Sequence, residues 1–353
     1  MIKLKISGIF SCLCFAGICT AFLINRDPFI ELGSKLLWRI DKNSYCGNGI
    51  YFRDDDYVIS PSPYASGDYE FEQLSRLSET LEAEGISLLY VNKPAKYLDD
   101  SIFRQYGTEN FCNDNADRLL ARLNEAGINT LDLRDELKRD GLDVYDMFYR
   151  TDHHWTVPAG KWGAEKIAAA LNEKCGYSID TSVYADENYT FKTTKEAWLG
   201  EQGAKFRGAG IRKDDYTLVT PDFDTDYTVD GEDLTFTEAF ISDPEECYHY
   251  NYSPRNCINN SVSKGKILML GDSYDAVTEP FLSLSVREMD FMVMRDTAPD
   301  SLTLDMIKEG GYDTVIVCYA PFMIGAHEDT SNANYRMFSF ESITSGSTGT
   351  AQQ

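Results

Sequence analysis

The chain has 353 residues, of which 43% are hydrophobic and 25% are charged, as in an ordinary globular protein with one large domain or two small ones. Its 57 acidic and 33 basic side chains give a formal net charge of -24. This charge argues against nucleic acid as a partner, because no basic stripe is available to neutralise phosphates, and more weakly against a strongly anionic polymer. An acidic surface also simply keeps an exposed domain soluble.

The N-terminus carries an apolar segment. Residues 6–24 contain no charged side chain, and Lys3 and Lys5 precede them. The segment has about the length that a helix needs to cross the ~30 Å hydrocarbon core of a bilayer, and the two lysines favour a cytoplasmic N-terminus. We therefore predict a transmembrane signal-anchor. A cleaved signal peptide with Ala21 near the cleavage site is the alternative, and both interpretations export residues 28–353.

Six of the nine cysteines lie in the part of the chain that is predicted to be exported to an oxidising compartment. Cys247 and Cys257 bracket a short, turn-rich loop, and we predict that they form a disulfide. Cys318 lies inside an apolar, strand-like run and is expected to be a buried thiol. No Cys or His spacing is typical of zinc, so no metal is predicted.

Helices and strands alternate in the first half of the chain. Apolar residues at helical spacing predict a helix over 69–85 that Gly85 ends, and residues 86–91 follow as an apolar strand. A helix over 115–125 and a strand over 128–133 repeat this order. Strand, helix and strand in succession indicate a parallel sheet with crossover helices.

The second half continues the pattern after an interruption. A helix is predicted over 159–171, and residues 178–263 are rich in Asp, Thr, Tyr and Gly, which indicates an insertion of hairpins and loops over one face of the sheet. We predict one α/β domain over 28–343, after residues 1–27 and before a disordered tail at 344–353. Strand and helix are expected to alternate again over 266–270, 276–288, 291–294, 302–309 and 314–318.

One candidate nucleophile follows an apolar strand. The strand leads into Gly271-Asp272-Ser273, and a helix is predicted just afterwards. This order places Ser273 at the carboxyl end of a strand, where open α/β sheets bind their ligands. Gly271 permits a sharp turn, and amides at a helix start can bind an oxyanion. A serine here is also a common helix N-cap, so this motif alone leaves both roles open.

A candidate base lies earlier in the chain. Two of the four histidines are adjacent in Asp152-His153-His154-Trp155. A serine hydroxyl needs a base to remove its proton, and the base needs a carboxylate to orient its ring. Asp152 and His154 are two residues apart, so a turn can bring them together. A metal site and a purely structural, hydrogen-bonded histidine pair are the alternatives, although no second His or Cys cluster completes a metal site.

Together the two segments resemble the DHHW family, which is related to the SGNH-like domains of alginate O-acetylation proteins in bacterial envelopes. Asp152, His154 and Trp155 match the family's Asp-x-His-Trp motif, and residues 271–274 match its Gly-Asp-Ser-Phe/Tyr motif. Residues 92–96 resemble its Pro-x-Lys stretch after the first strand. The resemblance implies an SGNH-like, flavodoxin-like domain of three layers with a central parallel sheet and a circularly permuted motif order.

The resemblance also implies roles for these residues. Ser273 attacks an acyl donor, His154 takes the proton, Asp152 orients the imidazole, and no cofactor takes part. The Gly-rich segment 198–208 departs from the family's pattern, so no second oxyanion donor follows from it. Candidates for oxyanion or substrate support are Tyr319, Arg295, Tyr274, Trp155 and His153, and His153 is expected to support its loop.

The leading functional hypothesis is an O-acetyltransferase that acts on an extracellular or cell-wall polysaccharide. It is expected on the outer face of a bacterial cell membrane, with a membrane-bound O-acyltransferase as the partner that supplies acyl groups. A carbohydrate O-acetylesterase is the first alternative, because the same residues serve when water replaces the sugar hydroxyl. A non-catalytic polysaccharide-binding or assembly protein is the second.

Overall fold

The computed structural model describes most of the chain from residue 57 onwards, in two units that are compact by their own contacts. The larger unit comprises Pro61–Tyr149, His154–Trp198 and Asp215–Gln353, and the smaller unit comprises Met1–Ser60, Arg150–His153 and Leu199–Asp214. The described residues are 57–205, 211–241, 255–298 and 301–345, together with Thr20, Phe29, Leu32, Gly33, Leu36, Tyr45, Cys46 and 50–52.

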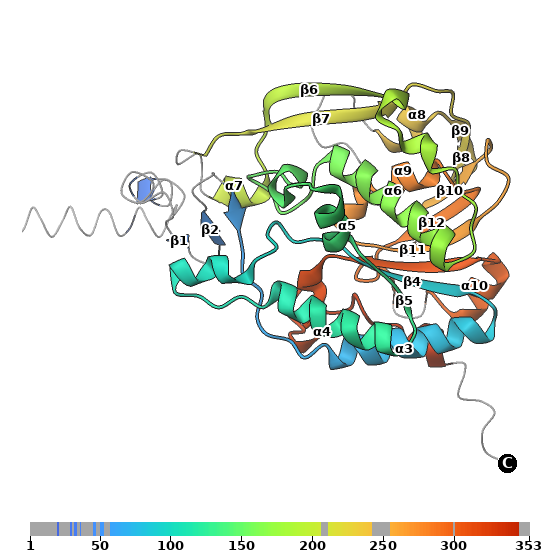
Figure 1. Ribbon diagram of the computed structural model, residues 1–353, viewed down its shortest axis with the longest axis horizontal. Helices are drawn as coiled ribbons and strands as arrows, with labels where there is room; N and C mark the ends of the chain where they lie inside the picture. The colour runs from blue at the N-terminus through green and yellow to red at the C-terminus, as the bar shows by residue number, and fades with distance from the viewer. Residues whose placement is uncertain are drawn as a thin grey trace, which may run out of the picture. The chain divides into compact units, whose positions relative to one another are not determined.

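A sheet of eight strands forms the centre of the larger unit (Figure 1). Its first five strands are parallel, and the last three are antiparallel to their neighbours, so the sheet is mixed rather than purely parallel. In spatial order the strands are β5 (Asn129–Asp132), β4 (Ser87–Asn92), β13 (Thr314–Tyr319), β11 (Lys266–Leu270), β12 (Glu288–Met292), β10 (Arg255–Asn259), β8 (Tyr227–Val229) and β9 (Glu232–Leu234).

The order of the five parallel strands identifies the fold. Let β11, β12 and β13 be numbered 1, 2 and 3, and let β4 and β5 be numbered 4 and 5. From β12 to β5 the spatial order is then 2-1-3-4-5, the flavodoxin-like doubly wound order. Because β4 and β5 come first in this chain, the order of the motifs is circularly permuted, as the resemblance implied. The topological switch point lies between the carboxyl ends of β11 and β13, where such sheets bind their ligands.

Helices cover both faces of the sheet and produce three layers (Figure 1). On one side α3 packs against β4, α4 and α11, and on the other α6 packs against β4, β5, α5 and α9. The α-helices of this unit are α3 (Asp68–Ala83), α4 (Cys112–Glu125), α5 (Leu133–Asp140), α6 (Val157–Lys174), α8 (Phe236–Phe240), α9 (Glu279–Ser283), α10 (Leu304–Gly310) and α11 (Glu341–Thr344). Short 3₁₀ segments are η1 (Asp100–Tyr106), η2 (Val144–Met147), η3 (Thr181–Tyr184), η4 (Asp186–Asn188), η5 (Ser273–Val277), η6 (Pro321–Met323) and η7 (Ala326–Glu328).

The central strands are buried as their composition predicts. All six residues of β13 are buried, because helices cover a parallel sheet on both sides. The helix predicted over 276–288 is wrong in its extent: η5 ends at Val277, and α9 then begins beside Pro280 and ends at Ser283. The strand predicted over 291–294 begins earlier, at Glu288, where β12 pairs with both β11 and β10.

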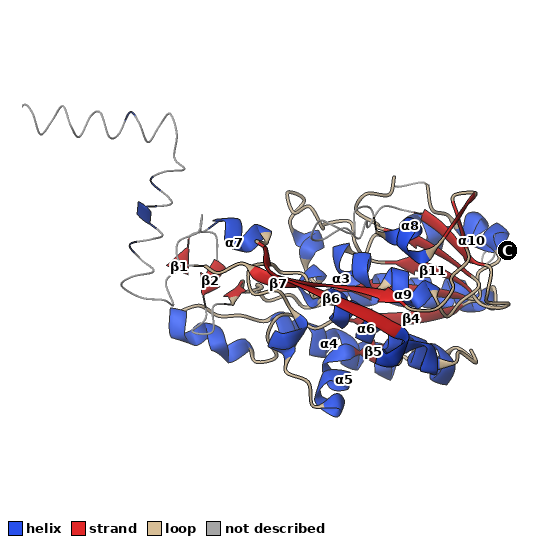
Figure 2. Ribbon diagram, turned by 90° about the horizontal axis from the view of Figure 1, so that it is seen from above, coloured by secondary structure: helices blue, strands red, loops and turns tan. Residues whose placement is uncertain are grey.

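The insertion over 178–263 differs from its prediction. β8, β9 and β10 extend the main sheet beyond β12 instead of lying over one face, because their short alternating sequences bury one side only. β6 (Tyr189–Trp198) and β7 (Asp214–Pro221) form a separate two-stranded sheet (Figures 1 and 2).

The described elements of the smaller unit include three short antiparallel strands and a short helix. These elements are β1 (Tyr45–Cys46), β2 (Ile50–Phe52), β3 (Val58–Ile59) and α7 (Glu201–Lys205). Within the described part of the chain, no helix is long and apolar enough to span a bilayer. Apart from Thr20, the predicted anchor at 6–24 lies outside the described residues, and so do residues 346–353 of the predicted tail.

Gly160 lets α6 approach η5 closely. A Cβ at this position would lie 2.2 Å from the carbonyl oxygen of Val277, a backbone atom that cannot swing away. We expect Gly160→Ala to lower the free energy of unfolding by roughly 1–3 kcal/mol through overpacking, although alanine is the better helix former by about 1 kcal/mol. Urea unfolding checks this result. Ala169→Gly, at an exposed position of the same helix, gives the effect of helix propensity alone, and a stabilised Gly160→Ala would contradict the prediction.

Candidate active site

A tight turn at the end of β11 carries Ser273. The amide of Gly271 donates to the carbonyl of Met292 across the sheet, at 2.9 Å. A Cβ on Gly271 would lie 2.5 Å from Asp275 Oδ2 and 2.6 Å from the ring of Phe291, so only glycine fits. Ser273 therefore begins η5 at the topological switch point.

Asp272, rather than Ser273, is the N-cap of η5. Its carboxylate accepts the amide N–H of Tyr274 at 2.9 Å, and the Asp275 carboxylate accepts the amide N–H of Asp272 at 2.9 Å. This reciprocal capping box satisfies the first amides of the turn. The alternative that Ser273 is an ordinary N-cap is therefore wrong, and its hydroxyl is available for other contacts.

A buried lysine lies beside the same turn. Lys93 Nζ, from the residue after β4, is 2.7 Å from Asp272 Oδ1 and 2.6 Å from Asp275 Oδ2, and all three side chains are completely buried. Burial alone would lower the pKa of Lys93, but the two carboxylates hold it above its ordinary value. Burial raises the pKa of Asp275 to about 6, against the opposing effect of Lys93.

The histidine segment meets the nucleophile directly. His154 Nε2 lies 2.7 Å from Ser273 Oγ, which is hydrogen-bond distance. Next to it, the fully buried indole of Trp155 donates its N–H to the carbonyl of Tyr274 at 2.8 Å. The adjacent residues His154 and Trp155 thus bond residues 273 and 274, and each pair is 119 positions apart in the chain. The structure brings together the two motifs that the sequence singled out.

Local backbone pairing holds the histidine segment. Phe148 pairs with Trp155 in an isolated antiparallel bridge, and the amide of Thr156 donates to the carbonyl of Met147 at 2.8 Å. Thr156 then caps α6 by accepting the amide N–H of Ala159. His154 is therefore presented from a closed loop that leads directly into a long helix, which limits its freedom.

Tyr274 supports this arrangement from within the core. Its ring is 2% exposed and lies 5.4 Å from the imidazole of His154 and 6.0 Å from the ring of Phe148, centroid to centroid. Lys93 Nζ lies 5.4 Å from the same ring. Tyr274 and Trp155 thus pack beside the histidine segment, and the oxyanion or substrate support predicted for them stays a prediction.

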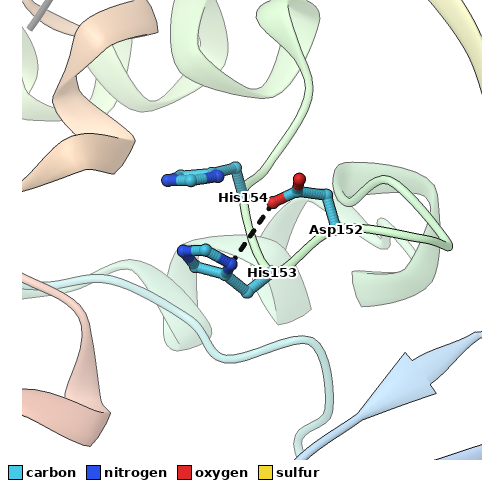
Figure 3. Close-up of side chains that lie close together, drawn as sticks. All are labelled: Asp152, His153 and His154. Atoms are coloured by element: carbon cyan, nitrogen blue, oxygen red, sulfur yellow. Dashed lines mark ion pairs between the residues drawn. The ribbon is translucent and has the colours of Figure 1, made fainter. Parts of the chain in front are cut away.

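Asp152 and His153 belong to the smaller unit. Asp152 is 3% exposed; its Oδ2 accepts the amide N–H of Glu201 at 3.0 Å, and its Oδ1 lies 3.3 Å from His153 Nδ1 (Figure 3). A Cβ on Gly200 would lie 2.3 Å from the Cβ of Asp152, so the chain needs glycine there. The Gly-rich segment 198–208, which departs from the family's pattern, thus provides a backbone donor to Asp152.

Thr151 fixes the backbone before the acid. Its amide and hydroxyl both donate to Asp214 Oδ2, and its own hydroxyl oxygen accepts the amide N–H of Gly200 at 2.8 Å. The amide of Gly203 donates to the carbonyl of Thr151 at 2.7 Å. Asp152 therefore follows a residue whose polar groups all have partners.

The three consecutive residues Asp152, His153 and His154 are the candidates for a metal site. Asp152, His153 and His154 each offer one ligand atom, and these atoms lie within 4.8 Å of one another (Figure 3). Their proximity is a property of the local chain, since they are adjacent in sequence. Nε2 of His154 is already at hydrogen-bond distance from Ser273. Among the described residues, no other group of three such ligands is as close together.

Two predicted oxyanion candidates have other partners. Tyr319 is fully buried at the end of β13, and its hydroxyl donates to the carbonyl of Met337 at 2.8 Å. Its one proton is thus used in the core, which contradicts the expected oxyanion role. Arg295 donates from Nη1 to Asn334 Oδ1 at 2.9 Å and from Nε to Asp296.

The cysteine predictions have different outcomes. Cys257 is a free, buried thiol in β10 rather than half of a disulfide, because its side chain faces the core of the sheet; Cys247 lies outside the described residues. Burial raises the pKa of the Cys257 thiol. Cys318 is a free and fully buried thiol, as predicted, and it donates to Asp275 Oδ1 at 3.4 Å.

Sequence reasoning missed the buried charges at this site. It assigned no role to Lys93 or Asp275, which are bonded to each other. It also assigned none to the amide N–H of Ala320, which donates to Asp272 Oδ2 at 2.8 Å. One available signal was the lysine directly after the apolar strand, within the stretch 92–96. A second was the Asp three residues after the Asp of Gly-Asp-Ser, which is the spacing of a capping box.

Comparisons with known proteins identify the family of the chain. A family model described as the SGNH hydrolase-like domain of acetyltransferase AlgX matches residues 51–231. No curated protein matches the sequence. The solved structure of Bacillus cereus PatB1 with a sulfonyl adduct has a TM-score of 0.63 at 17% identity, over 82% of this chain and 96% of that one.

A DHHW family protein from Eubacterium siraeum gives a TM-score of 0.60 at 19% identity, over 82% of this chain and 96% of that one. The solved structure of Bacillus cereus PatB1 itself gives 0.64 at 17% identity, over 82% and 99%. These likenesses show a shared fold. Because the family model spans just over half of the 353 residues, the chain belongs to the family of SGNH hydrolase-like domains of acetyltransferase AlgX, and it is an enzyme of the acyltransferase class.

Proposed function

We propose that this protein is an extracytoplasmic polysaccharide O-acetyltransferase that forms an acyl-serine on Ser273. The observation that carries the proposal is the 2.7 Å distance between His154 Nε2 and Ser273 Oγ at the switch point of the sheet. A serine becomes a useful nucleophile when a neutral imidazole is positioned to take its proton. Membership of an acetyltransferase family supports acyl transfer as the reaction.

The reaction has two halves. In the first, Ser273 Oγ attacks the carbonyl carbon of an acyl ester while His154 takes the hydroxyl proton; the imidazolium then returns this proton to the departing alkoxide, which leaves acyl-Ser273. In the second, His154 deprotonates a sugar hydroxyl, which attacks the acyl carbon and releases the serine with its proton restored. We assign Asp152, two residues earlier, to hold the imidazole in the required tautomer.

The place of the reaction and the acyl source form part of the proposal. An exported domain has no ready supply of acetyl-CoA, so a membrane-bound O-acyltransferase partner is inferred to deliver the acyl group across the bilayer. The apolar segment at 6–24 would hold the domain near that partner as an uncleaved anchor. The polymer is an extracellular or cell-wall polysaccharide.

One assay tests transfer against hydrolysis. The full-length protein, purified in detergent, is incubated with 4-nitrophenyl acetate with and without oligosaccharide acceptors, and the sugars are analysed by mass spectrometry. We expect acetylated oligosaccharide, with an acceptor-dependent rise in release of 4-nitrophenol. Acetate release without acetylated sugar identifies an esterase instead, and no turnover under any condition indicates the polysaccharide-binding alternative.

A further inference from the structure

We propose that Lys93 is a positioning residue for the nucleophile: it holds the carboxylates of Asp272 and Asp275 together and so fixes the turn that carries Ser273. This inference rests on the proposed function of Ser273. Lys93 touches neither the serine nor the histidine in the contacts described above, so its effect passes through the two aspartates on either side of the nucleophile.

The sheet order shows why a lysine is needed at this position. β4 is not the neighbour of β11, because β13 lies between them. Adjacent strands are about 4.8 Å apart, so the end of β4 lies roughly 10 Å from the end of β11. The long lysine stem spans this gap and places Nζ 2.7 Å from Asp272 and 2.6 Å from Asp275.

Both carboxylates are held by several donors. Asp272 Oδ1 accepts from Lys93 and from the amide of Tyr274, and Asp272 Oδ2 accepts from the amide of Ala320 just beyond β13. The result is a cluster that ties the carboxyl ends of β4, β11 and β13 to one turn.

Asp275 completes the cluster from the other side of Ser273. Its Oδ2 accepts from Lys93 and from the amide of Asp272, and its Oδ1 accepts from the thiol of Cys318 on β13. Every one of these groups is completely buried. A buried carboxylate without a counter-charge takes up a proton or moves towards water, and either response would change the turn.

The cluster affects catalysis through the position of the Ser273 hydroxyl. Ser273 lies between two residues of the cluster, Asp272 and Tyr274, and its hydroxyl must stay at 2.7 Å from His154. A displacement of about 1 Å at a reacting atom can cost about 10²-fold in rate. Loss of the lysine is therefore expected to slow attack by Ser273 without removing any group that contacts the substrate.

The test separates positioning from stability. The variant Lys93→Met alone would leave two buried carboxylates without a counter-charge, so the informative variant is Lys93→Met/Asp275→Asn, which keeps the formal charge of the cluster at -1 when the aspartates are ionised. Asp272→Asn is a second variant, which keeps the Lys93–Asp275 pair. Each full-length protein is treated with phenylmethylsulfonyl fluoride well below its own melting temperature, and the rate constant of Ser273 sulfonylation is measured by mass spectrometry.

Lys161→Met is the matched control. Lys161 is also a buried lysine, bound to the carbonyl of Tyr184 and to Asp186 Oδ1 at 2.7 Å, away from the turn. We expect it to lower the melting temperature but to leave the sulfonylation rate within about twofold of wild type. Both cluster variants are expected to lose about 10–10²-fold in that rate and in kcat of acetyl transfer, with KM little changed.

The outcomes distinguish a positioning role of Lys93 from a structural role only. If the folded variants are sulfonylated at the wild-type rate, Lys93 has a structural role only and the inference is overturned. If Lys93→Met/Asp275→Asn does not fold, Asp272→Asn decides the question by the same rate. If wild-type Ser273 itself is not sulfonylated, the proposed function fails first, and the inference fails with it.

Discussion

Ser273→Ala is expected to lower acetyl transfer by about 10⁴–10⁶-fold, because the variant lacks the hydroxyl that lies 2.7 Å from His154 Nε2 and that we propose to carry the acyl group. The nucleophile and its base act as one unit, so His154→Ala is expected to lose about as much, and the double variant little more. Release of 4-nitrophenol from 4-nitrophenyl acetate measures the loss, and intact-protein mass spectrometry measures the missing acyl-enzyme.

A second serine provides the control. Ser301 is exposed and donates to the local carbonyl of Ala298, so Ser301→Ala should retain the wild-type rate and melting temperature. The hydroxyl of Ser273 is not part of the cap of η5, so Ser273→Ala should also melt close to wild type. Wild-type turnover in folded Ser273→Ala would remove the mechanism altogether.

Asp152→Asn is expected to lower acetyl transfer by about 10²–10⁴-fold. An amide in place of the carboxylate favours the wrong imidazole tautomer and no longer stabilises the imidazolium that forms during attack. The backbone donor from Glu201 can still bind the amide oxygen, so the fold should persist. The rate of 4-nitrophenyl acetate turnover and the circular dichroism melting curve measure the two effects separately.

His153→Ala is the variant to compare with Asp152→Asn. Nδ1 of His153 lies 3.3 Å from Asp152 Oδ1, whereas Nε2 of its neighbour His154 lies 2.7 Å from Ser273 Oγ. If His153 only supports the loop, its loss should cost about tenfold or less. A loss as large as that of His154→Ala would instead place His153 among the groups that exchange protons with the substrate.

Both halves of the candidate site are visible in the sequence because each is a local pattern. An apolar strand followed by Gly-Asp-Ser, and an Asp-x-His-Trp segment before a helix, can be recognised within ten residues. That the two segments meet is what the resemblance to the DHHW family implies, because the histidine segment follows α5 and η2 and does not itself end a strand. The contact between His154 and Ser273 agrees with this expectation.

Other features stay hidden because they depend on distant parts of the chain. The partners of Lys93 lie 179 and 182 residues away, and a lysine after a strand usually points to solvent. The position of Tyr319 at a strand end indicates the correct edge of the sheet but not the direction of its side chain, which reverses with each residue. The short strands of the insertion lack the length that would distinguish a sheet extension from a surface hairpin.

The place of β13 has a consequence for how the enzyme matures. β13 is the last strand along the chain, yet it lies between β4 and β11 at the middle of the sheet. In a nascent chain that has emerged only as far as residue 313, β4 and β11 therefore belong to two half-sheets that β13 does not yet join, and the proposed nucleophile Ser273 follows one of them. Activity should therefore arise late and abruptly, when β13 inserts between β4 and β11. Pairing between strands so far apart in sequence is typical of slow folding.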